Sequence, residues 1–139
     1  MTLTVEVSDD LAACLDLRRI VFIEEDGVSV EDEVDGKDGD AIHLLARLNG
    51  EPVGTARVLA YGTTVKIGRV CVLKEHRGRG LGVLLIEGCH DAARGAGATR
   101  AILAAKTVAL PFYERLGYRA YGDVFIDADM PHKMMECSL

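Results

Sequence analysis

The chain has 139 residues, of which 49% are hydrophobic and 27% charged, and 16 basic against 22 acidic side chains give a net charge of −6. Domains typically hold roughly 100 to 200 residues, so we expect one domain over residues 1–139. No apolar run reaches the roughly 18 residues of a membrane span, and the negative charge opposes binding to a phosphate backbone. These features exclude a membrane protein and a nucleic-acid-binding protein. The N-terminus has no basic stretch followed by an apolar block, which predicts a cytoplasmic location.

Four cysteines are widely spaced and form no Cys-x-x-Cys pair; they are Cys14, Cys71, Cys89 and Cys137. The first three lie in apolar, periodic segments. This pattern is typical of small core residues rather than of zinc ligands or a disulfide framework, so we expect no metal site.

A strand over residues 3–7 and a helix are the first elements expected. Ser8 is a typical N-cap, and the two aspartates after it would place acidic groups in the first turn. Apolar residues then recur at steps of three and four as far as Phe22. Continued helical periodicity would bring Arg18 and Glu25 onto one face with Phe22.

Residues 24–40 carry nine acidic side chains, one lysine and three glycines, without helical or strand periodicity. We therefore expect a loop. The spacing of acids between Asp35 and Asp40 and the absence of a closing Glu exclude an EF-hand. Two interpretations remain open, a solvated acidic surface and a rim that attracts a cationic substrate.

Residues 42–73 are typical of three antiparallel strands, because turn-forming residues interrupt β-rich runs at 49–52 and 61–63. Helices and strands then alternate irregularly, which favours an α/β or α+β class with a mixed sheet. The expected elements are a helix from Leu81 to Ala96, a strand over 101–105, a helix over 111–116, and strands over 121–126 and 133–137.

A glycine-rich turn connects the last of the three strands to the long helix. Glycines let the backbone approach a ligand closely, and a helix N-terminus offers unpaired N–H groups and positive potential. Nearby basic side chains add charge, so the segment predicts an anion site. The spacing fits neither the Walker A pattern, which needs Gly-Lys-Ser/Thr, nor the dinucleotide pattern, because Val83 stands where its third glycine belongs.

The segment Arg77-Gly78-Arg79-Gly80-Leu81-Gly82 matches the R/Q-x-x-G-x-G/A signature of the GNAT superfamily of N-acetyltransferases, which cradles the pyrophosphate of acetyl-coenzyme A. Residues 111–118, PFYERLGY, resemble the family's FYEKLGF segment. With RRIVFIEEDG at 18–27, the chain resembles the ElaA/YjcF-like branch. The resemblance implies a GNAT fold of the α/β (α+β) class, in which about four helices flank a mixed, twisted sheet of six to seven strands.

The resemblance also implies that two neighbouring strands splay apart and that the pantetheine arm of acetyl-CoA lies in the gap. The expected cofactor-binding residues are Val70, Cys71, Val72, Arg77, Gly78, Arg79, Gly80, Leu81, Gly82, Val83 and Lys106. Two departures from the family pattern are visible. Lys74 replaces the usual proline before the glycine turn, and Ala104-Ala105-Lys106 replaces the NAQ of this branch, so Lys106 either supplies a charge there or leaves a weaker site.

The expected activity is transfer of an acetyl group from acetyl-CoA to a primary amine by direct attack in a ternary complex. Tyr113 is the expected general acid, because a neutral phenol can protonate the departing thiolate. Glu25, His43 and His132 are the candidate general bases. Arg69 lies inside an apolar strand and is expected to pair with Glu25 or with another acid of residues 24–40.

Two alternatives to this activity remain open. One is a non-catalytic acyl-CoA-binding module, and the other is an acyltransferase that uses a longer acyl-CoA. The acidic segment favours a cationic amine acceptor. The sequence leaves the oligomeric state open, and a homodimer is suggested only by analogy with the superfamily.

Overall fold

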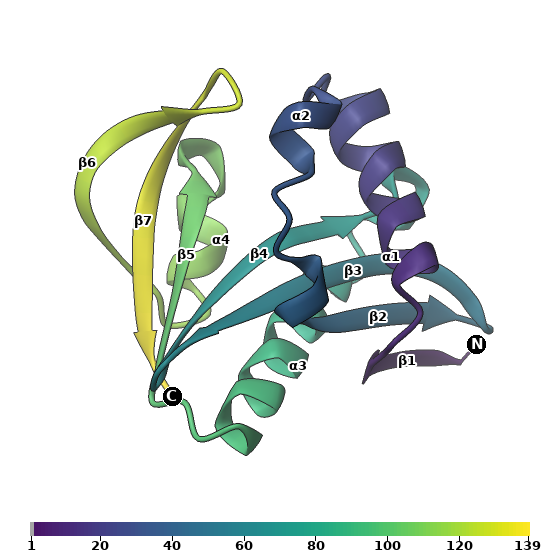
Figure 1. Ribbon diagram of the computed structural model, residues 1–139, viewed down its shortest axis with the longest axis horizontal. Helices are drawn as coiled ribbons and strands as arrows, with labels where there is room; N and C mark the ends of the chain where they lie inside the picture. The colour runs from purple at the N-terminus through teal and green to yellow at the C-terminus, as the bar shows by residue number, and fades with distance from the viewer. Residues whose placement is uncertain (1) are drawn as a thin grey trace.

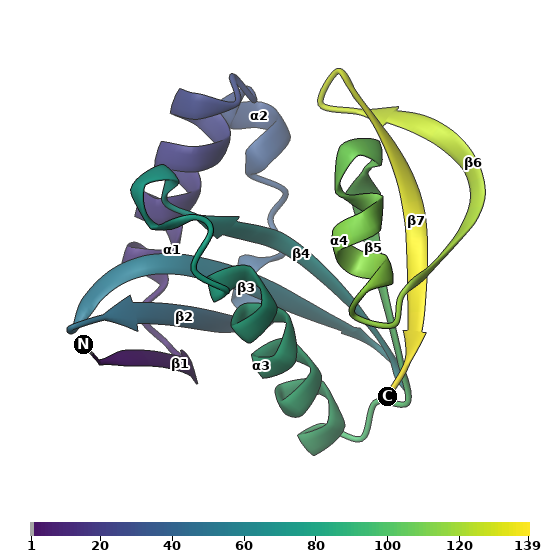
Figure 2. The same ribbon diagram turned by 180° about the vertical axis from the view of Figure 1, so that it is seen from behind.

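The computed structural model describes residues 2–139 as a seven-stranded sheet with helices on both faces (Figures 1 and 2). The strand order is β1-β2-β3-β4-β5-β7-β6. Neighbouring strands are antiparallel except β4 and β5, which are parallel. The mixed sheet and the four α-helices confirm the fold class that the sequence predicts.

The element bounds follow the predicted order along the chain. The strands are β1 (Leu3–Val7), β2 (Ile42–Leu48), β3 (Glu51–Tyr61), β4 (Thr64–Val72), β5 (Arg100–Lys106), β6 (Arg119–Asp127) and β7 (Met130–Ser138). The α-helices are α1 (Leu11–Arg18), α2 (Val30–Glu33), α3 (Leu81–Gly95) and α4 (Leu110–Glu114). A π-helix, η1 (Arg19–Glu25), and short 3₁₀ turns at Asp38–Asp40, Lys74–His76 and Thr107–Ala109 complete the set.

Two tight turns form the predicted meander of β2, β3 and β4. Asn49 and Gly50 both have positive φ angles, 52° and 85°, as the hairpin turns that match strand twist require. Gly62 has a φ of 64° in the second turn. The turn-forming residues therefore act as the sequence predicts.

The first helix differs from the prediction in its cap and in its length. Asp10, and not Ser8, accepts a hydrogen bond from the Ala13 N–H, at 3.1 Å. The α-helix ends at Arg18 and continues as the π-helix η1, whose wider turns rotate the later residues relative to the α-helical face. Arg18 is buried and Glu25 is exposed, so the expected shared face does not form.

The acidic segment 24–40 is more ordered than the predicted loop. Ser29 caps the short helix α2 by accepting a hydrogen bond from the Asp32 N–H at 3.1 Å. The prediction missed this helix because four residues are too few to show helical periodicity.

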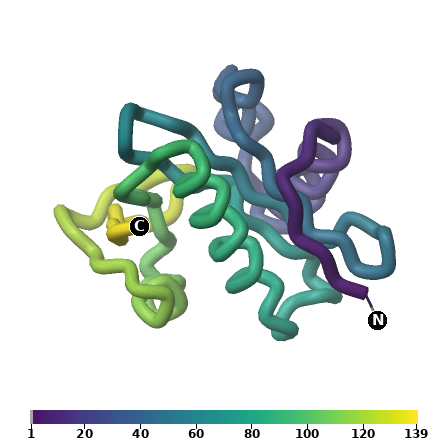
Figure 3. Tube along the Cα trace, turned by 90° about the horizontal axis from the view of Figure 1, so that it is seen from below, coloured from purple at the N-terminus to yellow at the C-terminus, as the bar shows by residue number. Residues whose placement is uncertain are grey.

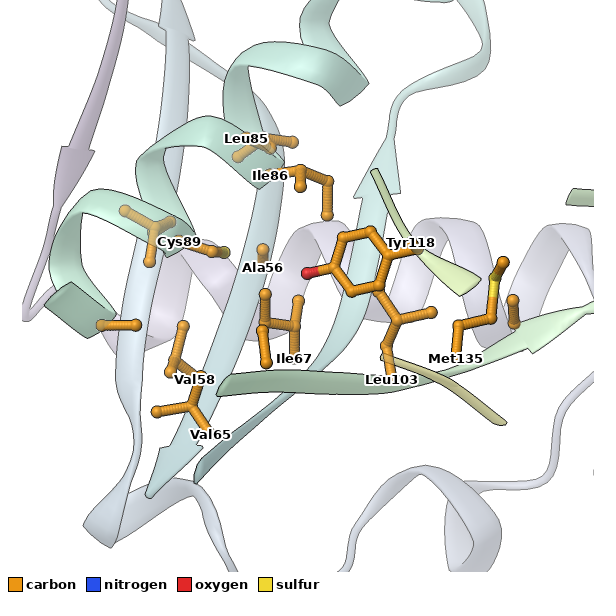
Figure 4. Packing of buried hydrophobic residues seen from close by; sticks show 14 of the residues in the cluster. Ala56, Val58, Val65, Ile67, Leu85, Ile86, Cys89, Leu103, Tyr118 and Met135 are labelled. Atoms are coloured by element: carbon orange, nitrogen blue, oxygen red, sulfur yellow. The ribbon is translucent and has the colours of Figure 1, made fainter. Parts of the chain in front are cut away.

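The larger core lies between the sheet and helices α3 and α4, which Figure 2 shows on the near face. Helix α3 approaches the sheet closely, since a β-carbon at Gly88 would lie 3.0 Å from Cγ1 of Val5. Tyr118 lies within this cluster (Figure 4), and its hydroxyl group is 2.6 Å from Nε2 of His90 on α3.

A smaller core lies on the opposite face of the sheet, beneath α1. Its buried members are Cys14, Leu17, Val21, Leu45 and Cys71. Cys89 is buried in the larger core, and Cys137 is partly buried. The four cysteines are free, and the first three are core residues as the sequence predicts.

The N-terminal and C-terminal strands lie at opposite ends of the sheet, with β1 at one end and β6 and β7 at the other (Figure 3). Among residues 2–139, no helix combines the length and apolar character needed to cross a membrane.

Candidate active site

Strands β4 and β5 pair over only part of their length. Their parallel pairing runs from Thr64 and Arg100 to Ile67 and Leu103 and then stops. Both strands continue beyond this point, and Figure 1 shows them diverging. Divergence leaves an open backbone edge on the last residues of β4, where an extended ligand can add as a further strand. The expected splay is therefore present.

A bulge in β4 determines which backbone groups face the gap. The register with β3 shifts between Thr55 and Arg57, and Arg69 adopts a φ of 53°. Beyond the bulge, the Leu73 N–H donates to the Val53 carbonyl at 2.9 Å.

Backbone groups of successive residues in an antiparallel strand alternate in direction. The N–H of Leu73 points toward β3, and so do the N–H and C=O groups of Cys71, two residues earlier. The N–H and C=O groups of Val70 and Val72 therefore point into the gap. Val70 and Val72 thus have the backbone direction expected for pantetheine binding, and Cys71 does not. The Cys71 side chain still lines the cleft.

The glycine-rich turn at the end of β4 has the backbone conformation of an anion site. Gly78 and Gly80 both have a φ of 79°, in the left-handed region that favours glycine. Gly80 precedes α3 and supplies no side-chain cap, and the N–H of Leu84 is the first in the helix to bond back to it, at 3.2 Å. The N–H groups of the first helical turn are therefore free to bind a ligand.

A cleft of about 570 Å³ connects the open edge of β4 to this turn. It contains most of the residues that the sequence assigns to the cofactor, whereas Arg79 lies outside it. The predicted residues in the cleft are Val70, Cys71, Val72, Arg77, Gly78, Gly80, Leu81, Gly82, Val83 and Lys106.

A second cleft, of about 490 Å³, lies beside the first on the α1 face of the sheet. It contains Tyr113 from α4 and His132 from β7. The residues common to both clefts are Phe22, Asp26, Val70, Lys106 and Ala109. The two clefts therefore meet at the gap between β4 and β5, which provides one place for a donor to meet an acceptor.

Tyr113 lies in an aromatic group at the wall of the second cleft. Its ring packs edge-on against Phe112 and Tyr118, with centroid separations of 5.0 and 5.8 Å. Burial raises the pKa of the Tyr113 hydroxyl to about 12, so this group is protonated at neutral pH. It can donate a proton or a hydrogen bond to a developing anion.

His132 has a defined orientation in the same cleft. Its ring stacks on Phe125, and Nδ1 lies 2.8 Å from the carbonyl oxygen of Met130. Because a carbonyl only accepts, Nδ1 carries the proton in the neutral ring, and the lone pair is on Nε2. His132 can therefore accept a proton at Nε2.

The other two candidate bases have less favourable surroundings. Glu25 forms a two-pronged ion pair with Arg77, at 2.6 and 2.7 Å, and this guanidinium lowers the pKa of the Glu25 carboxyl. His43 is buried and lines neither cleft, and its Nε2 lies 3.0 Å from the carbonyl oxygen of Asp38. Two residues predicted in separate roles, Glu25 and Arg77, thus bind each other.

Asp26 is a residue that the sequence reasoning missed. It follows η1 directly and lies 3.1 Å from Nζ of Lys106 at the end of β5. Both residues line both clefts, so this ion pair lies where the clefts meet. The partners are 80 residues apart, and no local pattern could have paired them.

Arginines and carboxylates form a network beside the second cleft, and Glu33, Asp35, Arg57 and Arg69 of this network line it. Buried Arg18 contacts Glu33 at 2.5 Å and Asp38 at 2.8 Å. Arg57 contacts Asp35 at 2.8 Å and Asp38 at 3.2 Å. The interpretation as a solvated acidic surface is wrong for Glu33, which is buried, and for Asp38, which is half-buried, because both pair with buried Arg18. Asp35 is exposed and pairs with buried Arg57.

Arg69 joins the same network. Its guanidinium lies 3.6 Å from Glu33 and 3.4 Å from Asp35. This confirms the expected pairing with an acid of residues 24–40, although Glu25 is not the partner. The network holds the acidic segment over β3 and β4 and forms part of the cleft wall.

This combination of a splayed mixed sheet, a glycine turn at a helix N-terminus and two meeting clefts defines an acyl-CoA-dependent N-acyltransferase fold. The family model for the acetyltransferase (GNAT) domain matches residues 22–139. The chain belongs to the GNAT acetyltransferase family and is an acyltransferase.

Relatives of known sequence or structure agree with this assignment. The chain is 37% identical over 120 residues to the N-acetyltransferase YjcF of Bacillus subtilis, with 86% of each chain covered. It is 34% identical to an acyl-CoA N-acyltransferase structure from Pseudomonas aeruginosa (TM-score 0.85) and 29% identical to Escherichia coli ElaA (TM-score 0.84). Both structural comparisons cover 98% of each chain. The predicted resemblance to the ElaA/YjcF-like branch is confirmed.

Proposed function

We propose that this chain transfers an acetyl group from acetyl-CoA to a primary amine by direct attack in a ternary complex. The observation that carries the proposal is the meeting of the two clefts at the open edge of β4. A donor held along β4 and an acceptor in the second cleft would bring their reacting atoms together without a covalent enzyme intermediate.

The cofactor side supplies backbone groups rather than side-chain chemistry. The N–H groups at the start of α3 would bind the pyrophosphate, where the helix dipole adds positive potential. Both gap-facing groups of Val70 and the N–H of Val72 would bind the pantetheine arm as an added strand, since the Val72 carbonyl already accepts from Arg77. One of these N–H groups would also stabilise negative charge on the thioester oxygen during attack.

Proton transfer in this proposal involves His132 and Tyr113. The amine nitrogen attacks the carbonyl carbon, a C–N bond forms, and the C–S bond then breaks. Nε2 of His132 takes the proton that the amine loses, directly or through one water molecule, and the Tyr113 hydroxyl gives its proton to the departing sulfur. The raised pKa of Tyr113 supports its role as the acid.

Cys71 is the one thiol that lines the cofactor cleft among residues 2–139. Burial raises the pKa of the Cys71 thiol to about 12, so almost none of it is thiolate at neutral pH. Since the thiolate is the reactive nucleophile, this supports direct transfer rather than an acyl-cysteine intermediate.

Thiol release from acetyl-CoA, measured over a panel of primary amines, tests the proposal. We expect amine-dependent release, with the acetylated amine detected by mass spectrometry. Propionyl-CoA, butyryl-CoA and octanoyl-CoA in the same assay measure the acyl preference, and a longer chain preferred over acetyl would contradict the acetyl assignment. Binding of acetyl-CoA without turnover on any amine would instead indicate the non-catalytic module, and the absence of binding would overturn both functions.

A further inference from the structure

The Arg77 side chain hydrogen-bonds to two other parts of the protein. Its Nε donates to the carbonyl oxygen of Val72 at 3.0 Å. Its two terminal nitrogens donate to the two carboxylate oxygens of Glu25, at 2.6 and 2.7 Å. A planar guanidinium has five N–H donors in a fixed arrangement, and these contacts use three of them, one on each nitrogen.

These contacts connect three parts of the cofactor cleft. Glu25 ends the π-helix η1, Val72 ends β4, and Arg77 begins the glycine turn. All three residues line the same cleft. The Arg77 side chain therefore lies between the open edge of β4 and the anion site.

The carbonyl group of Val72 would otherwise be a binding group for an added strand. Strand alternation directs it into the gap, because the neighbouring Leu73 N–H bonds to Val53 on β3. Arg77 donates to this carbonyl, whereas no side chain of residues 2–139 hydrogen-bonds to the Val70 backbone. An extended ligand can thus pair with both backbone groups of Val70, whereas at Val72 only the N–H remains for it, and the strand-like pairing ends there.

We propose that Arg77 is a positioning residue, held by Glu25, which caps the Val72 carbonyl and sets the point where the pantetheine arm of acyl-CoA turns from β4 toward the pyrophosphate site. It is not itself a phosphate ligand. This inference rests on the proposed use of acyl-CoA, and it replaces the cofactor-charge role that the sequence predicts for Arg77 and the base role considered for Glu25.

The affinities of two ligands distinguish a positioning role of Arg77 from a direct contact with phosphate. Coenzyme A carries the pantetheine arm and the phosphates, whereas pantetheine carries the arm alone. If Arg77 bound phosphate, its replacement would weaken the affinity for coenzyme A and leave the affinity for pantetheine unchanged. A positioning residue acts on the arm, so Arg77→Gln should weaken both ligands by a similar factor, about tenfold for loss of charge-assisted hydrogen bonds.

The experiment measures dissociation constants of coenzyme A and pantetheine by NMR titration of ¹⁵N-labelled protein, which does not require turnover. Glu25→Ala should weaken both ligands as Arg77→Gln does, and the double variant should be no weaker than either single variant. If Arg77 were a phosphate ligand, Glu25→Ala would free its guanidinium and tighten coenzyme A binding. Tighter binding, or a loss confined to coenzyme A in Arg77→Gln, would overturn the inference.

Arg94→Gln is the control, because it removes the same charge from an exposed position on α3 and Arg94 lines neither cleft. It should change pantetheine binding by less than twofold. Arg77→Lys keeps the positive charge but has a single donor nitrogen, so it should recover part of the affinity for both ligands. Melting temperatures measured without ligand show whether each variant folds, and a merely structural role would lower them without changing the affinity of the folded protein. If the wild-type chain binds neither ligand, the proposed function fails rather than the role of Arg77.

Discussion

Gly82 on α3 lies against the ring of Phe112, so that a β-carbon at position 82 would be 3.2 Å from Cζ of Phe112. The glycine-rich signature and the segment 111–118 are separate motifs in the sequence, and here they are in contact. Gly82 and Phe112 also line the cofactor cleft together. The glycine at this position therefore leaves space for an aromatic side chain as well as for a ligand.

Gly82→Ala should weaken acetyl-CoA binding by displacing Phe112 into the cleft. Stability should change by less than about 1 kcal/mol, because the gain in helix propensity offsets the crowding. Gly95→Ala is the control, since a β-carbon there has nothing within 4 Å, and it should leave affinity unchanged. Calorimetric titration of both variants checks this, and restored affinity in Gly82→Ala combined with Phe112→Leu would confirm the cause. Equal affinities of Gly82→Ala and wild type would contradict it.

Tyr113→Phe should lower kcat by about 10²-fold, near the lower end of the effect of general acid catalysis. The ring and its packing stay, so acetyl-CoA affinity and melting temperature should be unchanged. A donor with a more acidic thiol needs less help to expel its thiolate, and the loss should be smaller with that donor. An equal loss with both donors, measured when the chemical step limits turnover, would assign Tyr113 to packing alone.

His132→Asn should lower kcat by about 10² to 10⁴-fold without changing acetyl-CoA affinity. The Asn amide can still donate to the Met130 carbonyl, whereas the distal nitrogen and the ring that stacks on Phe125 are lost. Steady-state turnover and calorimetric titration with acetyl-CoA measure the two effects separately.

His43→Gln provides the comparison for this variant, because His43 lines neither cleft and its side chain contacts only the Asp38 carbonyl. We expect it to retain the wild-type kcat. A large loss of kcat in His43→Gln together with a normal kcat in His132→Asn would reverse the assignment of the base.

Asp35 links the acidic segment to the pH dependence of folding. The hydrogen bonds from Arg57 hold the pKa of the Asp35 carboxyl well below its usual range, so this group stabilises the fold above about pH 4, where it ionises in the unfolded chain. That stability is lost as the pH falls toward the folded-state pKa. Asp35→Asn should therefore be less stable than wild type at pH 7, and the difference should shrink below pH 4.

Urea midpoints between pH 7 and pH 2 measure this effect. Asp91→Asn, which changes an exposed carboxylate on α3, should follow the wild-type curve, because an exposed ion pair contributes little. Parallel curves for Asp35→Asn and wild type would show that the ion pairs of Asp35 do not couple folding to pH.

Local patterns in the sequence determined most of the elements and the anion site. The hairpin turns follow from residues that adopt positive φ, such as Asn49 and Gly50, and the length of α3 follows from its apolar period and its closing glycines. The anion site at the glycine turn could be predicted for the same reason, because free N–H groups at a helix N-terminus and a flexible backbone are local properties. Tyr113 could be singled out because a short motif surrounds it.

Only the tertiary structure decided which charged groups meet. Glu25 and Arg77 are 52 residues apart, and Asp26 and Lys106 are 80 apart, so neither pair shares a local pattern. The π-helical turn also changed the face on which Glu25 lies, because it shifts the helical period within a single segment. Ion pairs depend on distance in space, and the packing of α1 and the acidic segment onto the sheet sets that distance.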